Sequence, residues 1–231
     1  MRPLEAGGIA LPQCYWQLPD PFGADPDEDL VGIGADMDPA TVLHGYATGL
    51  FPMQVNLADS EDSPVLGWWS PNPRGVLPLS ELRVSRSLSH SMKKFEVTFD
   101  SAFVEVMNGC QRPGEEGQWI TQEFINCYGQ LHEMGFAHSV EVWNQTGELI
   151  GGLYGIELGG LFAGESMFHR ERDASKVALS ALVEKLLKCQ GPRLLDVQWK
   201  TDHLASMGVI EISRDEYLES LQVALKNRAC F

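Results

Sequence analysis

The sequence predicts an α+β protein with a smaller α+β domain at the N-terminus and an α/β domain at the C-terminus. Residues 1–65 are rich in proline, glycine and acidic side chains and hold one helical pattern, whereas helical and strand patterns alternate regularly after Trp119. The 231 residues are enough for one large or two small domains with a buried core. We place the N-terminal domain at 1–65, continuing through a proline-rich, basic segment to about 110, and the second domain at 111–231.

Regular elements are sparse in the N-terminal half. A helix is expected after Asp38 and Pro39, a favourable N-cap and first helical position, and it should end near Gly49. The next block, WWSPNPRGVLPL, is interrupted by prolines and predicts a loop with a short strand. It is followed by a basic helix over 85–94, a strand over 95–99 and a helix over 101–110.

The C-terminal half has a regular order of elements. Gly159 and Gly160 predict the turn between two antiparallel strands. The order helix, antiparallel strands, helix, strand is typical of an acetyltransferase-like (GNAT) fold. The expected elements are a helix over 122–134, strands over 138–143, 149–156 and 160–168, a helix over 174–188, a strand over 193–199 and a short helix over 202–207.

Charge argues against a general nucleic-acid binder, because the net charge is −15. Its distribution is uneven, however. Between 74 and 94, five basic residues face only Glu81: Arg74, Arg83, Arg86, Lys93 and Lys94. This local excess could hold a phosphate backbone, although a solvated helix face explains it equally well.

The cysteines, the histidines and the apolar runs argue against several further classes of protein. The five cysteines are odd in number and scattered, so we expect reduced structural thiols rather than disulfides or a zinc site. Histidines form no metal motif. No apolar run is long enough for a membrane span and no secretory signal begins the chain, which indicates a cytoplasmic protein. A monomer is expected, because coiled-coil heptads are absent.

A lone carboxylate, Glu165, lies in an otherwise small and apolar hairpin, beside Met167 and Phe168. Lone charges are seldom buried without a partner, so this position suggests chemistry or recognition. The alternative is a solvated glutamate, or one paired with Arg170 or Arg172.

A second polar pair lies in the strand LLDVQW, where alternation places Asp196 and Gln198 on one face and Leu195, Val197 and Trp199 on the other. The pair could orient an attacking amine and take part in removing its proton, or it could anchor the following turn. No nucleophile–base pair indicates a covalent intermediate, so direct transfer is expected.

Phosphate-binding motifs for ATP or a dinucleotide are absent, and no cofactor is expected. The glycine-rich turn of acetyltransferases is replaced by HRERDASK. An acyl donor other than a coenzyme A thioester is therefore favoured.

Nine collinear blocks together carry a resemblance. They are GIGADMDPATVLHGYATGLFP, WWSPNPRGVL, SRSLSHSMKK, WIT, LHEMGFAHSVEVW, GGLYG, GESMFHRERDASK, LLDVQ and TDHLASMG. From about residue 30 to Tyr217 the chain resembles the leucyl/phenylalanyl-tRNA-protein transferases. The resemblance implies a cytoplasmic enzyme that moves Leu or Phe, and sometimes Met, from aminoacyl-tRNA to proteins beginning with Arg or Lys, which creates a degradation signal. It also implies no need for ATP.

The resemblance also implies roles for individual residues. Asp196 and Gln198 would act on the attacking amine, with either a side chain or the terminal ribose hydroxyl of the tRNA carrying the proton. Glu165 would bind the terminal adenosine or the donor amino group, and Trp119 would stack near that adenosine. The apolar side-chain pocket would be lined by Leu153, Phe162, Met167, Leu182 and Leu195, and the acceptor stem would be contacted by Arg83, Arg86, Lys93 and Lys94.

The chain departs from the family pattern at two places. Met53 stands where the family usually has tryptophan after Phe-Pro, so an aromatic that helps to form the adenosine site is missing. The acidic segment 55–64 predicts weaker and more salt-sensitive tRNA binding.

Two rival functions remain open: a coenzyme A-dependent N-acyltransferase and a non-catalytic tRNA- or peptide-binding module.

Overall fold

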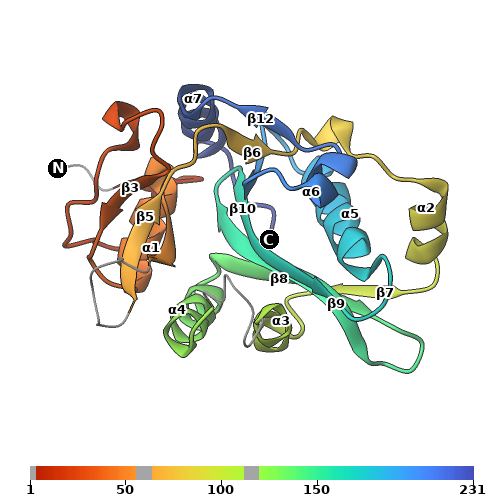
Figure 1. Ribbon diagram of the computed structural model, residues 1–231. Coiled ribbons are helices and arrows are strands. Elements are labelled where there is room, and N and C mark those ends of the chain that lie inside the picture. Colours follow the sequence, from red (N-terminus) through yellow and green to blue (C-terminus); the bar gives the residue numbers. More distant parts are fainter. Residues whose placement is uncertain (1–3, 56–63, 112–119) are drawn as a thin grey trace.

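The computed structural model describes residues 4–55, 64–111 and 120–231, and Trp119 therefore lies outside the described residues. Figure 1 shows two sheets side by side, a small one toward the N-terminus and a large one. The small sheet has the strand order β3-β5-β4, formed by β3 (Leu30–Ile33), β4 (Phe51–Val55) and β5 (Val65–Trp69). A separate antiparallel pair joins β1 (Glu5–Ala6) and β2 (Ile9–Ala10).

The large sheet is mixed and has seven strands in the order β12-β6-β11-β10-β9-β8-β7. Neighbours β8, β9 and β10 are antiparallel, whereas β11 pairs in parallel with β10. The strands are β6 (Arg74–Val76), β7 (Glu96–Phe99), β8 (Ala137–Trp143), β9 (Leu149–Leu158), β10 (Leu161–His169), β11 (Leu194–Gln198) and β12 (Ile210–Ile212). The predicted α+β class is confirmed.

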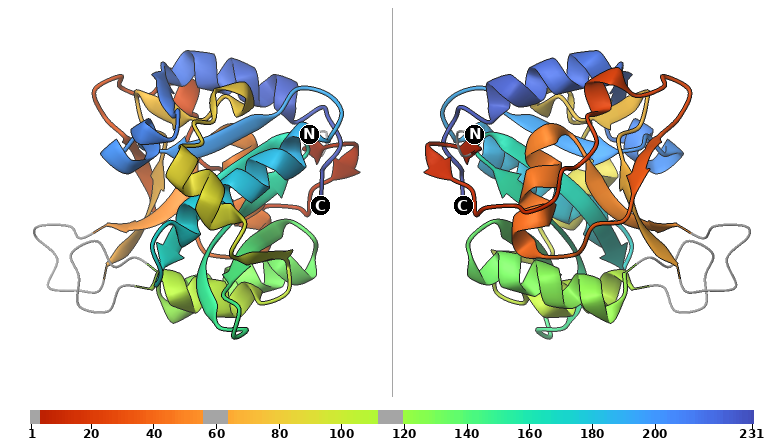
Figure 2. Two further views of the ribbon diagram at one scale, coloured as in Figure 1. Left: turned by 90° about the vertical axis from the view of Figure 1, so that its right-hand side faces the viewer. Right: turned by 90° about the vertical axis from the view of Figure 1, so that its left-hand side faces the viewer.

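Helices cover both faces of the large sheet. On one face, α5 (Ala174–Leu187) packs on a cluster that includes Leu153 and Phe162, and on the other α3 (Phe103–Cys110) and α4 (Gln122–Glu133) pack on a cluster that includes Tyr154. Alternation along β9 explains the division, because neighbouring side chains point to opposite faces. Figure 2 shows α7 (Arg214–Ala224) along one edge of the molecule, where it contacts both η1 (Pro21–Gly23) and β11.

The predicted first helix illustrates how local sequence sets a boundary. In α1 (Pro39–Thr48), the Asp38 side chain accepts a hydrogen bond from the Ala40 amide, and Gly49 ends the helix with a φ of 92°. A non-glycine residue seldom adopts that conformation. The other short helices are α2 (Arg86–Met92), α6 (Asp202–Ser206) and η2 (Leu79–Glu81).

Several elements go beyond the sequence prediction. The strands of the small sheet, β12 and α7 were not expected, and both β6 and β7 pair within the large sheet although they precede residue 111. The start of α7 did carry a signal, because Ser213 and Glu216 form a capping box. No helix among the described ranges is long and apolar enough to cross a membrane.

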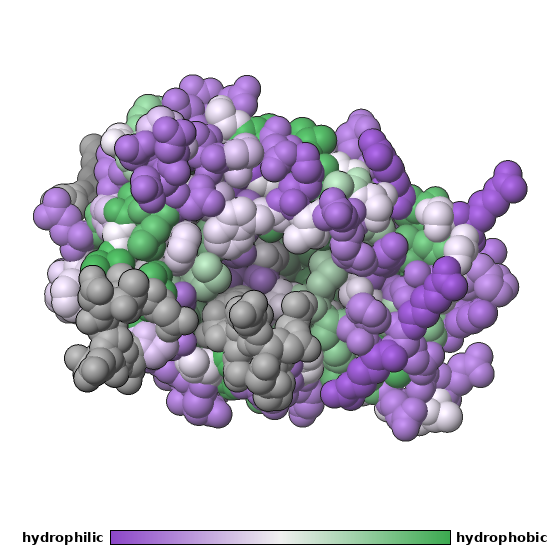
Figure 3. All heavy atoms as spheres, viewed as in Figure 1, coloured by the Kyte–Doolittle hydropathy of each residue, from purple (hydrophilic) through white to green (hydrophobic). Residues whose placement is uncertain are grey.

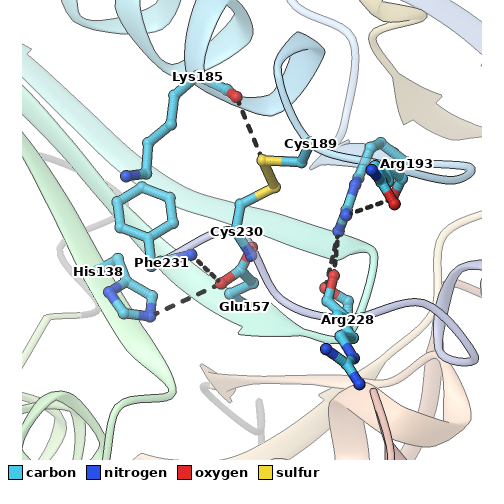
Figure 4. The surroundings of a disulfide bond; sticks show 10 residues. His138, Glu157, Lys185, Cys189, Arg193, Arg228, Cys230 and Phe231 are labelled. Carbon is cyan, nitrogen blue, oxygen red and sulfur yellow. Dashed lines mark hydrogen bonds and ion pairs between the residues drawn. A yellow bond between two sulfur atoms is a disulfide. The ribbon is translucent and has the colours of Figure 1, made fainter.

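The cysteine prediction was wrong for one pair. Cys189 and Cys230 form a disulfide between the end of α5 and the C-terminal segment, with Cα atoms 5.9 Å apart (Figure 4). Beside it, the backbone amides of Cys230 and Phe231 donate to the Glu157 carboxylate, and the Phe231 ring stacks on His138. Spacing alone could not show the pair, because 41 residues separate the two cysteines. Among the described residues, Cys14, Cys110 and Cys127 take no part in a disulfide.

Candidate active site

A pocket of about 490 Å³ opens between the small sheet and the β10–β11 part of the large sheet. Figure 3 shows the surface hollowed at the centre of this face. Its walls include Met53 from β4 and Leu179 from α5, while Glu165 from β10 and Gln198 from β11 supply polar groups. An apolar cavity with few polar groups is the usual form of a small-molecule site.

Four of the five predicted pocket residues lie on this wall: Leu153, Met167, Leu182 and Leu195. Phe162 lies deeper instead, fully buried, with its ring centroid 5.9 Å from that of Phe231. This part of the pocket wall thus consists of flexible or branched aliphatic side chains, which can adapt to more than one apolar ligand.

Glu165 is buried, with 8% of its surface exposed. Its carboxylate accepts hydrogen bonds from the Gln198 amide at 2.9 Å and from the Tyr128 hydroxyl at 3.2 Å. The Tyr46 hydroxyl lies 2.6 Å from that of Tyr128, so a hydrogen-bonded chain runs from α1 to the pocket. Burial raises the pKa of Glu165 from 4.5 to about 8, although the hydrogen bonds from Tyr46 and Tyr128 oppose the shift.

Neither alternative for Glu165 fits this environment. The side chain is not solvated, and the nearby arginines are occupied elsewhere: Arg170 donates to the Leu149 carbonyl, and Arg172 approaches Asp173. A register shift in β10 between Gly164 and Ser166 brackets Glu165. Bulges of this kind redirect a side chain and are common next to functional sites.

Asp196 is fully buried and lies off the pocket wall. Arg74 donates to both of its carboxylate oxygens, at 2.9 and 2.6 Å, and the Tyr217 hydroxyl donates at 2.8 Å. The assignment of Arg74 to the phosphate-binding basic excess was wrong, because this guanidinium is buried in the ion pair. Asp196 is therefore connected to the pocket through its neighbours.

One of those neighbours is Gln198. Its backbone amide donates to Asp196 at 2.9 Å, and its φ is 66°, an uncommon conformation for a residue with a side chain. Such a conformation persists where the surroundings hold it, frequently at active sites. The Gln198 side chain thereby reaches Glu165, which leaves its carbonyl oxygen available to a ligand.

The alternation predicted for β11 holds only up to Gln198. Leu195 and Val197 pack with the α5 cluster, as expected for that face. Trp199 does not join them but packs edge-on against Phe51 and Trp69 of the small sheet. The left-handed backbone of Gln198 and the register shift beside it explain the change of face.

Sequence reasoning missed the supporting residues Tyr46, Tyr128 and Tyr217, as well as the role of Arg74. Tyr46 and Arg74 lie within two of the nine blocks, but the blocks do not indicate their contacts, and Arg74 is 122 residues away from Asp196. The predicted tRNA-binding residues Arg83, Arg86, Lys93 and Lys94 are all exposed, on or beside α2. They form no ion pair with another described residue.

We expect Glu165→Gln to flatten the pH dependence of stability. In the unfolded chain this carboxyl loses its proton near pH 4.5, whereas the folded protein retains it up to about pH 8. The folded state binds more protons over this interval, so this group's contribution to stability is lost as pH rises. Urea unfolding at several pH values between 5 and 8 should show a smaller decline for the variant. Equal declines would contradict the assignment, and Glu184→Gln, at an exposed position on α5, is the control.

Two family models match the chain. The model described as leucyl/phenylalanyl-tRNA protein transferase matches residues 76–222, and the model of that family's N-terminal domain matches residues 35–72.

Curated relatives are similar to this chain over most of their length. A leucyl/phenylalanyl-tRNA–protein transferase from Maridesulfovibrio salexigens is 47% identical over 217 residues, covering 92% of this chain and 87% of the relative. One from Herpetosiphon aurantiacus is 50% identical, covering 84% and 98%. Among solved structures, "The structure of L-PGS from Bacillus licheniformis" is similar over 58% of this chain and 50% of its own, at 12% identity and with a TM-score of 0.39.

Proposed function

The chain belongs to the leucyl/phenylalanyl-tRNA protein transferase family, and we propose that it moves leucine or phenylalanine onto proteins that begin with arginine or lysine. It is an aminoacyltransferase that transfers an aminoacyl group from aminoacyl-tRNA to a protein N-terminus. The proposed donor preference rests on the aliphatic pocket wall of Leu153, Met167, Leu182 and Leu195. Such a wall fits Leu and Phe alike but offers no partner to a charged side chain.

The transfer is direct in this proposal. The acceptor α-amine attacks the ester carbonyl of the donor, an amide bond forms, and the bond to the ribose oxygen breaks. One amine proton leaves, and the ribose oxygen takes up a proton. Because the Gln198 amide nitrogen donates to Glu165, its carbonyl oxygen accepts a hydrogen bond from the amine. Gln198 therefore orients the amine, while Asp196 is a positioning residue that holds the Gln198 backbone.

The donor ester is already activated, so the reaction needs no ATP. Glu165 binds the donor's terminal adenosine or amino group in this proposal. We also propose that the product is a degradation signal and that the enzyme acts as a monomer in the cytoplasm.

The order α4, β8–β9–β10, α5, β11, with β11 parallel to β10, supports a GNAT-like C-terminal domain. The large sheet of this proposed domain also includes β6 and β7, which precede residue 111 in the sequence.

Replacing Met53 with tryptophan should strengthen donor binding. Met53 lines the pocket, where the family usually has an aromatic residue, and base stacking on an aromatic ring contributes about 1–3 kcal/mol. We expect KM for Phe-tRNA to fall by about tenfold, while Met53→Leu leaves it nearly unchanged. Steady-state kinetics with both variants provide the measurement. A KM for Met53→Trp equal to that of the wild type would show that the adenosine lies elsewhere.

The proposed function is tested by peptide mass. Purified protein is incubated with Leu-tRNA or Phe-tRNA and an Arg-starting peptide, without ATP, and the same peptide with an acetylated N-terminus is the control. A mass gain of one Leu or Phe residue, confined to the free N-terminus, is the expected result. No gain with either donor, or equal gain with donors that carry charged amino acids, would contradict the proposal.

A further inference from the structure

A second cavity, of about 430 Å³, adjoins the pocket. The two share His169, Ser175 and His203 in their walls. The second cavity adds Lys176 from the first turn of α5. Three elements, the end of β10, the start of α5 and α6, therefore bring potential hydrogen-bond donors around one space.

The charge of this cavity is opposite to that of the chain. Lys176 is half-buried and forms no ion pair with another described residue, in a protein of net charge −15. Asp173 is the one carboxylate among the described residues that line this wall, and it accepts a hydrogen bond from Ser91 at 2.9 Å and lies 4.0 Å from Arg172. His169, Lys176 and His203 all line this cavity. Burial lowers the pKa of His203, and the nearby positive charges of Lys176 and His169 lower it further.

An unpaired cation beside two imidazoles favours an anion of several oxygens. We propose that His169, Lys176 and His203 bind a phosphodiester of the donor's single-stranded 3′ end while the aminoacyl group occupies the adjoining pocket. This inference rests on the proposed function. It adds the site that holds the nucleic-acid backbone next to the reacting ester.

The acceptor protein is a poorer occupant, because an N-terminal Arg or Lys would meet like charges here. The exposed basic residues instead favour a nucleic acid as the occupant of the cavity. Ser91 belongs to α2, and its hydrogen bond to Asp173 joins the cavity wall to the helix that precedes Lys93 and Lys94. The helix α2 contacts α5, whose first turn forms part of the cavity wall (Figure 1). The cationic side chains on and after α2 therefore lie where a track for successive phosphates would continue.

The test compares donors that differ in phosphate count. Phe-adenosine has no phosphate, Phe-CpA has one phosphodiester, and Phe-tRNA has the complete backbone. Lys176→Gln should lower kcat/KM for Phe-CpA and Phe-tRNA by about tenfold, the size expected for a lost charge-assisted hydrogen bond. Transfer from Phe-adenosine should stay within twofold of wild type. Lys188→Gln, on an exposed position at the other end of α5, is the matched control.

Two outcomes would overturn the proposal. An equal loss on all three donors would assign Lys176 to folding or to the pocket, and an unchanged kcat/KM for Phe-CpA would leave the cavity without a phosphate. If the wild type transferred from none of the donors, the proposed function itself would fail, which is a distinct result.

A binding measurement separates this site from activity altogether. Calorimetry with CpA and with adenosine should show that wild-type protein prefers CpA and that Lys176→Gln loses this preference. The logarithm of the CpA binding constant should also fall less steeply with the logarithm of the salt concentration in the variant. One phosphate contact on a single strand contributes about 0.7 to the size of that slope. Coenzyme A supplies the same phosphate chemistry from another source, so tighter binding of coenzyme A than of CpA would contradict the assignment to the tRNA end.

Discussion

Replacing Arg74 with methionine should lower the free energy of unfolding by about 3–5 kcal/mol, because it leaves the Asp196 carboxylate buried and unpaired. Arg74 donates to both oxygens of that carboxylate, and neither side chain is exposed. Its guanidinium also lies 4.2 Å from the Tyr217 ring and 4.9 Å from the Phe51 ring. Urea unfolding monitored by tryptophan fluorescence gives the measurement.

Two further variants test the cause of this loss. Arg86→Met changes an exposed arginine on α2 and should alter stability by less than about 0.5 kcal/mol. The double variant Arg74→Met/Asp196→Leu removes both charges, so it should be more stable than Arg74→Met alone. A double variant that is less stable than the single one would mean that packing of Arg74, and not the unpaired charge, dominates.

The elements of the large sheet that were predicted correctly are those whose local sequence patterns match their conformation in the folded chain. Helical periodicity and the turn at Gly159–Gly160 predicted α5 and the β9–β10 hairpin, and their bounds agree with the structure within about three residues. The small sheet escaped prediction for a physical reason. Its strand β4 contains Pro52 and its strand β5 contains Gly67, and both residue types weaken a strand pattern.

The carboxylate of Glu165 and the amide of Gln198, which both line the pocket, were singled out from their strands, but their supports were not. Tyr128 is on α4 and Tyr46 on α1, so only the folded chain brings their hydroxyls to Glu165. Strand alternation also assumes regular backbone, and it failed after Gln198, where φ is positive. Local patterns thus predicted which polar groups are unusual, whereas tertiary contacts decide what each group can do.

The largest effect on activity is expected for Gln198→Ala. In the proposed mechanism the amide accepts a hydrogen bond from the attacking amine, and loss of one such preorganised group costs about 10²–10³ in rate. Glu165 would also lose its partner at 2.9 Å. We expect kcat for transfer from Phe-tRNA to an Arg-starting peptide to fall by that factor, with KM for Phe-tRNA changing much less. Single-turnover rates followed by peptide mass separate the two quantities.

The backbone at this position provides a decisive control. Glycine tolerates a φ of 66° without strain, whereas alanine does not, so Gln198→Gly removes the side chain but keeps the local conformation. If the amide itself orients the amine, the Gly and Ala variants should lose similar activity, while Gln190→Ala, on an exposed loop, should stay within twofold of wild type. Recovery of most activity in Gln198→Gly would instead assign the effect of alanine to backbone strain. The acceptor amine would then have to be oriented by another group in the pocket, of which Glu165 is the nearest candidate.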